Sequence, residues 1–419
     1  MTALPPLLPG QGITSVCSAH PLVLRAALRH AAQTGLPVLI EATCNQVNHQ
    51  GGYTGMTPAG FAALVTRLAQ AEGCPPDRVI LGGDHLGPNP WRHLPADQAM
   101  AEAEACVAAF VAAGFVKIHL DASMGCAGEP RALDDAATAV RAARLARVAE
   151  AARPATGPAP RYVIGTEVPP PGGADHALDQ ITATAPNAAR QTYRIHRDLF
   201  AEQGLQDAFS RVIALVVQPG VEFGNRNIVT YDRVAARPLV SALADLPGLV
   251  FEAHSTDYQP GAALAALVAD GFAILKVGPE LTFAMREALY ALDLIASDLV
   301  PGYGARPLMT GMEATMQAAP GWWQDHYPSG DEGRVMRHYS LSDRIRYFWP
   351  DPQAQAAVDN LRAALADRPI PLPLIWQHLP GADAFAEGRT SIDDIIIWRI
   401  SRVLHRYHTA CRGMTKEDT

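Results

Sequence analysis

The stretch Val79-Ile80-Leu81-Gly82-Gly83-Asp84-His85 places a carboxylate and an imidazole directly after a short apolar run. Runs of four to eight β-branched or leucine residues bounded by Gly or Pro are typical of strands that are buried on both faces. Most of the first 280 residues repeat this pattern. The runs cover residues 13–18, 38–44, 79–85, 115–121, 162–167, 212–218, 249–254 and 272–278.

A stretch with a helical pattern follows each run. These stretches cover residues 21–34, 58–71, 95–113, 133–152, 187–203, 233–246, 261–270 and 283–297. Several begin with Pro, which is well tolerated in the first turn of a helix. Strands that alternate with helices predict parallel β-α units. Eight such units predict the α/β class and a (β/α)8 TIM barrel, in which catalytic groups lie at the C-terminal ends of the strands.

The chain continues well beyond the predicted barrel. It has 419 residues, whereas a TIM barrel typically needs about 250. After Pro301 the alternation stops, and residues 301–350 are rich in aromatic, charged and Pro residues, with helical patterns from residue 353 onward. We therefore expect a catalytic barrel domain over residues 1–300. Residues 301–419 are expected to form an aromatic-rich segment and a helical extension that packs on the barrel.

Composition restricts the partners and the compartment. A net charge of -8 argues against a general nucleic-acid or anionic-membrane partner. The six cysteines contain no CxxC pair, which favours reduced thiols. Residues 1–10 lack the basic start and apolar segment of a signal peptide, and no apolar run approaches the roughly 20 residues that span a bilayer. These features predict a soluble cytoplasmic protein.

Polar residues gather where the apolar runs end. Because the C-terminal ends of parallel barrel strands meet at one rim, these residues are expected to form a single site. The candidates are Glu41, Asn45, Asp84, His85, His119, Asp121, Glu167, Gln218, His254, Asp257 and Lys276.

Four of these strand ends resemble the zinc-dependent class II ketose-bisphosphate aldolases. They are Asp84-His85, residues 120–123, Glu167 followed by Gly172-Gly173, and residues 276–278. The whole chain is similar to the GatZ/KbaZ family, through residues 41–48, 83–88, 276–279 and 342–347. Members of that family are labelled non-catalytic subunits of tagatose-bisphosphate aldolase or tagatose-6-phosphate kinases. Some are understood to be D-tagatose 6-phosphate 4-epimerases.

The resemblance implies a divalent metal cofactor, zinc, and a role for each candidate. The implied metal ligands are His85, Glu167 and His254. The implied catalytic residues are Asp84 as acid/base, with Glu41 and Asp121. The implied substrate-binding residues are Asn45, His119, Gln218, Asp257 and Lys276.

The sequence departs from the aldolase pattern in two places. Gln218 stands where the aldolases have a ligand histidine on strand six, and an amide oxygen is a poorer zinc ligand than imidazole. Residues 255–258 replace the glycine-rich phosphate loop after strand seven. Recognition of a phosphate group therefore has to come from another part of the chain.

Each candidate also has a purely structural interpretation. A histidine in a barrel strand is often a hydrogen-bonded core residue, and a carboxylate among apolar residues can belong to a structural ion pair. Lys276 lies close in sequence to Glu280, which offers a plain salt bridge. Arg344 and Arg346 can brace the extension instead of binding a phosphate group.

The chemistry implied by the resemblance is inversion at C4 of a ketohexose phosphate by retro-aldol cleavage and re-formation of the C3–C4 bond. We therefore expect a metal-dependent epimerase that converts D-tagatose 6-phosphate to D-fructose 6-phosphate. An accessory subunit that stabilises a class II tagatose-bisphosphate aldolase is the alternative. A sugar kinase ranks last, because the sequence lacks a Gly-rich loop with Gly-Lys-Ser/Thr. The expected partner is a small sugar or sugar phosphate, and a second copy of the chain or an aldolase stays open.

Overall fold

The computed structural model describes residues 2, 4–7, 10–165, 181–389 and 391–412. Eight parallel strands close into a barrel in the order β1-β10-β9-β6-β5-β4-β3-β2. The strands are β1 (Ile13–Cys17), β2 (Val38–Thr43), β3 (Val79–Leu86), β4 (Lys117–Leu120), β5 (Arg161–Gly165), β6 (Val212–Val216), β9 (Val250–Ala253) and β10 (Phe272–Val277).

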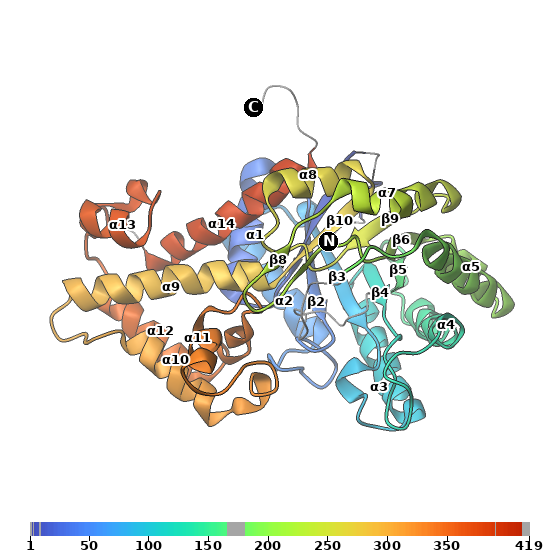
Figure 1. Cartoon of the computed structure of the whole chain (residues 1–419), viewed down its shortest axis with the longest axis horizontal. Helices are drawn as coiled ribbons and strands as arrows, with labels where there is room; N and C mark the ends of the chain where they lie inside the picture. Colours follow the sequence, from blue (N-terminus) through green and yellow to red (C-terminus); the bar gives the residue numbers. More distant parts are fainter. Residues whose placement is uncertain (1, 3, 8–9, 166–180, 390, 413–419) are drawn as a thin grey trace.

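Helices surround this barrel, as Figure 1 shows. They are α1 (Pro21–Thr34), α2 (Pro58–Ala71), α3 (Ala96–Ala112), α4 (Asp135–Ala151), α5 (Pro186–Glu202), α6 (Gln206–Phe209), α7 (Arg233–Ser241), α8 (Gly261–Ala269) and α9 (Pro279–Leu299). The predicted (β/α)8 TIM barrel is confirmed. Each strand begins and ends within two residues of its prediction, except that the predicted end of the fifth strand lies outside the described residues.

The chain adds elements that the repeat did not predict. A short antiparallel pair, β7 (Glu222–Phe223) and β8 (Ile228–Val229), follows β6. Beyond α9 the helices are α10 (Pro307–Ala318), α11 (Gly330–Tyr339), α12 (Pro352–Leu365), α13 (Leu372–His378) and α14 (Ile392–Cys411). The long helix α14 packs along α1, α8 and α9. In the part of the chain that is described, no helix has the length and apolarity needed to cross a membrane.

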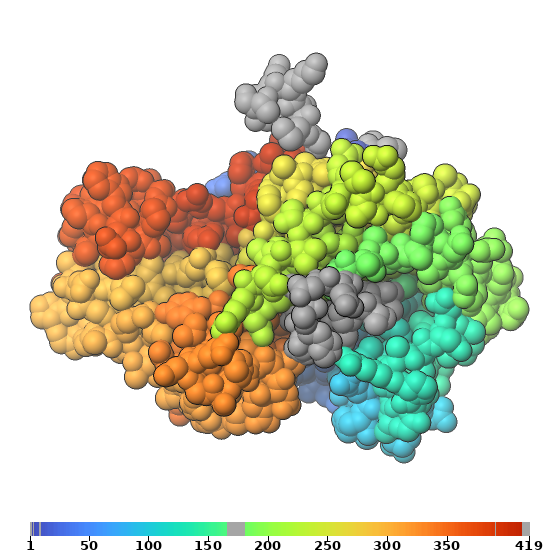
Figure 2. Space-filling view, in the orientation of Figure 1, coloured from blue at the N-terminus to red at the C-terminus, as the bar shows by residue number. Residues whose placement is uncertain are grey.

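Helices α10 to α13 gather on one side of the barrel, where they are drawn in orange and red in Figures 1 and 2, and α14 runs from there along the barrel to α8. The boundary at residue 300 stays a prediction. It falls directly after α9, which is the last helix of the β-α repeat.

An apolar layer fills the barrel interior toward the N-terminal ends of the strands. It is formed by buried side chains from six of the eight strands, together with Leu4 and Val116, which lie outside the strands: Leu4, Ile13, Leu39, Ile80, Val116, Val163, Ala214, Val216 and Ile274. Such a layer is normal for a TIM barrel, whose interior is a packed core and not a pore.

Ionic side chains occupy the next layer toward the C-terminal ends of the strands. Because side chains alternate along a strand, Glu41 follows Leu39 on the inner face of β2. The strand register places Glu41 beside Gly82, and Gly82 beside Lys117. A Cβ atom on Gly82 would lie 2.5 Å from Oε1 of Glu41. Glycine at position 82 therefore makes room for the Glu41 carboxylate.

Two lysines and two glutamates balance each other in this layer. Lys117 Nζ lies 2.6 Å from Oε1 of Glu41 and 2.7 Å from Oε2 of Glu252. Lys276 also pairs with Glu41, and its Nζ lies 3.7 Å from Oε1 of Glu252. Lys117, Glu41 and Glu252 have no exposed side-chain surface. Removing one member of such a buried network leaves an uncompensated charge, which is costly.

We predict that Lys117→Met lowers the free energy of unfolding by about 3 to 5 kcal/mol, because two buried carboxylates, Glu41 and Glu252, each lose an ion-pair partner. Equilibrium urea denaturation measures this change. Arg399→Met is the matched control, since Arg399 pairs with Glu287 near the surface, where such pairs contribute about 0 to 1 kcal/mol. Equal losses in the two variants would contradict the importance of the buried layer.

Candidate metal centre

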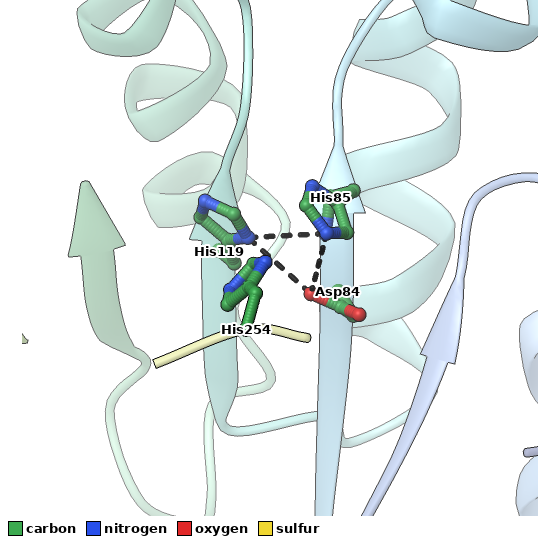
Figure 3. Close-up of side chains that lie close together, drawn as sticks. All are labelled: Asp84, His85, His119 and His254. Carbon is green, nitrogen blue, oxygen red and sulfur yellow. Dashed lines mark hydrogen bonds and ion pairs between the residues drawn. The ribbon is translucent and has the colours of Figure 1, made fainter. Parts of the chain in front are cut away.

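Three imidazoles and one carboxylate converge above the ionic layer. Asp84 and His85 lie at the end of β3, His119 lies on β4, and His254 directly follows β9. One nitrogen or oxygen atom from each of the four residues lies within 4.8 Å of the others. Figure 3 shows the four side chains pointing toward one another.

An irregular strand end brings Asp84 and His85 to the same side. In a regular strand, successive side chains point to opposite faces. His85 has a positive φ of 46°, and the register of β3 with β4 shifts between Gly83 and Leu86. The Cys44 thiol donates a hydrogen bond of 2.9 Å to the His85 carbonyl and helps to hold this conformation. Local backbone strain of this kind is often found at functional sites.

Carboxylates fix the orientation of two of the imidazoles. The Nδ1–H of His85 donates to Oδ2 of Asp121 at 2.8 Å, which leaves Nε2 of His85 with its lone pair. The Nε2–H of His254 donates to Oε1 of Glu252 at 3.0 Å. Nδ1 of His254 is buried and has no hydrogen-bond partner among the described residues. Burial lowers the pKa of His254 to about 3, so this imidazole is neutral at physiological pH.

The third imidazole, His119, faces a carboxylate with its second nitrogen. Its Nε2–H donates to the Gly165 carbonyl at 3.0 Å. Its Nδ1 lies 3.3 Å from Oδ1 of Asp84 and also 3.3 Å from the backbone N–H of His85. Burial lowers the pKa of His119, but the hydrogen bond to Asp84 and the charge of Asp121 outweigh burial and raise it above its usual value.

This donor set fits a divalent cation. Imidazoles whose outer N–H groups are bound to carboxylates or a carbonyl are typical metal ligands, because the outer contact fixes the tautomer. His254 supplies an unpaired buried lone pair, and His119 directs a nitrogen at a carboxylate oxygen, so a cation between them would satisfy both. The described part of the chain therefore contains a site compatible with a metal, made of Asp84, His85, His119 and His254.

Lys276 stabilises the negative charge of Asp84. Its ammonium group pairs with Oδ1 of Asp84. Burial alone would raise the pKa of Asp84, but His85, Lys276 and the His119 hydrogen bond hold it well below its usual range. Oδ2 of Asp84 makes no hydrogen bond within the described ranges and stays available to a bound molecule.

A cavity of about 450 Å³ opens above the cluster. Most of the predicted site residues line it: Asn45, Asp84, His85, Asp121, His254, Asp257 and Lys276. A volume of this size accommodates a small ligand. The structure therefore brings most of the sequence candidates to one site.

Three other predicted residues do not line the cavity, and a fourth lies outside the described residues. Glu41 is one layer deeper, between Lys117 and Lys276, and does not line the cavity. Gln218 also does not line it, because its Oε1 accepts hydrogen bonds from the backbone of Gly220 at 2.8 Å and Val221 at 3.0 Å. His119 stands in the imidazole cluster. Glu167 lies outside the described residues.

Glu252 and Lys117 were not among the predicted site residues. The sequence does contain a pattern that could have predicted them. Glu252 lies two residues before His254, and Lys117 lies two residues before His119, so each points to the same face of its strand as a predicted site residue. The suggested pair of Lys276 with Glu280 is wrong, because Glu280 pairs with Arg406 on α14. The closeness of Lys276 and Glu280 in the sequence did not show that Lys276 points into the barrel, where it pairs with Glu41 and Asp84.

We predict that Asp121→Asn weakens binding of a divalent ion at this cluster about 10- to 100-fold, because the amide no longer fixes the His85 tautomer. Competition with a chromogenic chelator, using Zn²⁺ as the probe, measures the affinity. Asp97→Asn is the matched control, since Asp97 lies fully exposed on α3. An unchanged affinity in Asp121→Asn would show that the Asp121 contact does not orient a metal ligand.

Comparison with known proteins agrees over nearly the whole chain. The family model for the D-tagatose-1,6-bisphosphate aldolase subunit GatZ/KbaZ-like proteins matches residues 9–412. A relative from Agrobacterium fabrum, named D-tagatose 6-phosphate 4-epimerase, is 59% identical over 401 residues, or 95% of this chain and 94% of the relative. The crystal structure of a probable tagatose 6 phosphate kinase from Sinorhizobium meliloti is 53% identical, has a TM-score of 0.88, and is matched over 96% of this chain and 100% of that one. The chain described here belongs to the GatZ/KbaZ-like family.

Proposed function

We propose that this chain is a D-tagatose 6-phosphate 4-epimerase that forms D-fructose 6-phosphate. The name and 59% identity of the Agrobacterium relative support the substrate and the reaction. The observation that carries the chemistry is the convergence of three oriented imidazoles on Asp84 at the base of the cavity. The six cysteines of the chain are free, which fits the reducing cytoplasm as the place of the reaction.

His85, His119 and His254 are the residues that we expect to hold the metal. A divalent ion held there, for which we propose zinc, would act as a Lewis acid for the negative charge that develops on the ketose oxygens as the C3–C4 bond opens. Glu167 stays a predicted further ligand. The resemblance implied that His119 binds the substrate, and we propose that it binds the metal instead.

Asp84 handles the proton of the C4 hydroxyl. The carboxylate takes this proton while the electrons of the O–H bond form the C4 carbonyl, and the pair of the C3–C4 bond passes to the C1–C3 half. The aldehyde half then rotates and presents its other face to C3. When the bond re-forms, the same Asp84 returns the proton and C4 is inverted. A closed site has to retain the aldehyde during this rotation.

The remaining site residues bind and position. Asn45, Asp257 and Lys276 line the cavity and offer an amide, a carboxyl group and an ammonium group to sugar hydroxyls. Glu41 and Glu252 act from the ionic layer, where Glu41 holds Lys276 and Glu252 orients His254. Asp121 orients His85. These contacts keep the catalytic groups in place without touching the sugar.

We predict that the purified protein, without an aldolase and without ATP, converts D-tagatose 6-phosphate to D-fructose 6-phosphate, and that a chelator abolishes the conversion. Asp84→Asn should lower kcat about 10²- to 10⁴-fold, because the proton acceptor is removed. A coupled assay for D-fructose 6-phosphate measures both effects, with Asp97→Asn as the control. Stabilisation of a separate aldolase without turnover would favour the accessory subunit, and dependence on ATP would favour the kinase.

A second prediction tests the bond that breaks. In retro-aldol chemistry the hydrogen on C4 stays with the aldehyde half, so the product formed in D₂O should carry no deuterium at C4. Nuclear magnetic resonance of the recovered D-fructose 6-phosphate gives the answer. Deuterium at C4 would show that the C4–H bond is cleaved and would overturn the proposed mechanism.

A further inference from the structure

A carboxylate already occupies the place where many barrels bind phosphate. TIM barrels frequently bind a phosphate group near the loops that follow their last two strands, at a helix N-terminus. Here Oδ1 of Asp257 accepts hydrogen bonds from the N–H groups of Gly278, at 2.9 Å, and Glu280, at 2.8 Å. These N–H groups lie at the start of α9. A second anion at this helix end would meet the Asp257 carboxylate and lose the backbone donors.

The cavity wall offers one other strong cation. Arg346 is the only arginine among the described residues that line the cavity, and Lys276 is the only lysine. Lys276 is neutralised by Asp84, Glu41 and Glu252. Arg346 has no carboxylate within ion-pairing distance in the described part of the chain. The charge of Asp343 acts on Arg346, but the Asp343 carboxylate itself pairs with Arg286 at 3.3 Å. A cation at a cavity with no carboxylate in direct contact is suited to an anionic ligand.

The Arg346 guanidinium is held in place but keeps free donors. Nη1 donates to the backbone carbonyls of Ser342 and Asp343, and Nη2 donates to the Tyr347 hydroxyl at 2.8 Å. The group also lies over the Tyr347 ring, 4.4 Å from its centre. Nε and the second N–H of Nη2 make no hydrogen bond to any described residue. Two adjacent N–H groups of this kind match two oxygens of a phosphate group.

Buried contacts tie the segment that carries Arg346 to the barrel. Arg346 lies on the short 3-10 helix η6 (Arg344–Phe348). Just before it, Asp343 accepts a hydrogen bond of 2.6 Å from Thr282 on α9, and the Tyr258 hydroxyl donates to the Leu341 carbonyl at 2.6 Å. The guanidinium is therefore positioned before any ligand arrives, which reduces the entropic cost of binding.

We propose that Arg346 binds the phosphate group of the substrate, so that the segment after the barrel supplies the phosphate recognition that the barrel loops do not. The identity of the substrate rests on the proposed function. The phosphate-binding role of Arg346 rests on the cavity and its charges. The sugar carbons then extend from Arg346 toward Asp84 and the imidazole cluster.

The test compares an unreactive phosphorylated ligand, D-glucitol 6-phosphate, with D-glucitol itself. Calorimetric titration of the full-length protein should show that the phosphorylated ligand binds more tightly, and that Arg346→Met reduces this preference roughly a hundredfold. Arg346→Lys, which keeps the charge but loses the planar fork, should give an intermediate loss. Arg334→Met, on the exposed face of α11, is the matched control and should keep the full preference.

Three outcomes are decisive. A full preference for D-glucitol 6-phosphate in Arg346→Met or in Arg346→Lys would overturn the proposal. If Arg346→Met does not fold, as judged by its thermal unfolding, Arg346→Lys still decides. If the wild type binds D-glucitol 6-phosphate through Arg346 but does not convert D-tagatose 6-phosphate, the phosphate site stands and the proposed function fails.

Discussion

The active end of this barrel depends on charge neutrality in its interior. Lys117 holds Glu41 and Glu252 together in a layer without solvent, and Lys276 joins that layer to Asp84. Glu252 in turn fixes the ring of His254. Ion pairs deeper in the barrel thus hold the side chains that face the cavity in place. Long-range Coulomb attraction in a low-dielectric interior makes such pairs strong only while every member is present.

The sequence predicted the barrel well because the fold depends on a repeated local pattern. Apolar runs and helical stretches alternate at regular intervals, and the rim is defined by where the runs end. The rim position of His85, His254 and Lys276 followed from this rule alone. Their partners did not, because Lys276 meets Glu41 across 235 positions of sequence, a contact that only barrel closure and register create.

Two features of the site are visible only in the three-dimensional structure. Alternation along a strand would separate Asp84 from His85, and a left-handed residue at position 85 brings them together. The residue types alone also did not predict that His119 lies in the imidazole cluster, or that the Gln218 side chain accepts a hydrogen bond from the nearby backbone N–H of Gly220. Short-range hydrogen bonds of this type depend on loop geometry, which periodicity does not describe.

The extension was predicted as a helical addition, but its contribution to the cavity was not. The aromatic residues between 322 and 349 indicated a packed segment, and Tyr347 and Trp322 indeed stack with ring centres 4.5 Å apart. Which of Arg344 and Arg346 faces the cavity depends on the turn of a short 3-10 helix.

Glycine at position 82 also makes positions 41 and 82 depend on each other, although they are far apart in the sequence. Since a methyl group there would collide with the Glu41 carboxylate, alanine at position 82 is compatible only with a shorter residue at position 41. Related barrels should therefore replace Gly82 only where Glu41 is replaced as well. Co-variation of the pair across an alignment would distinguish members that retain the ionic interior from those that have replaced it with an apolar one.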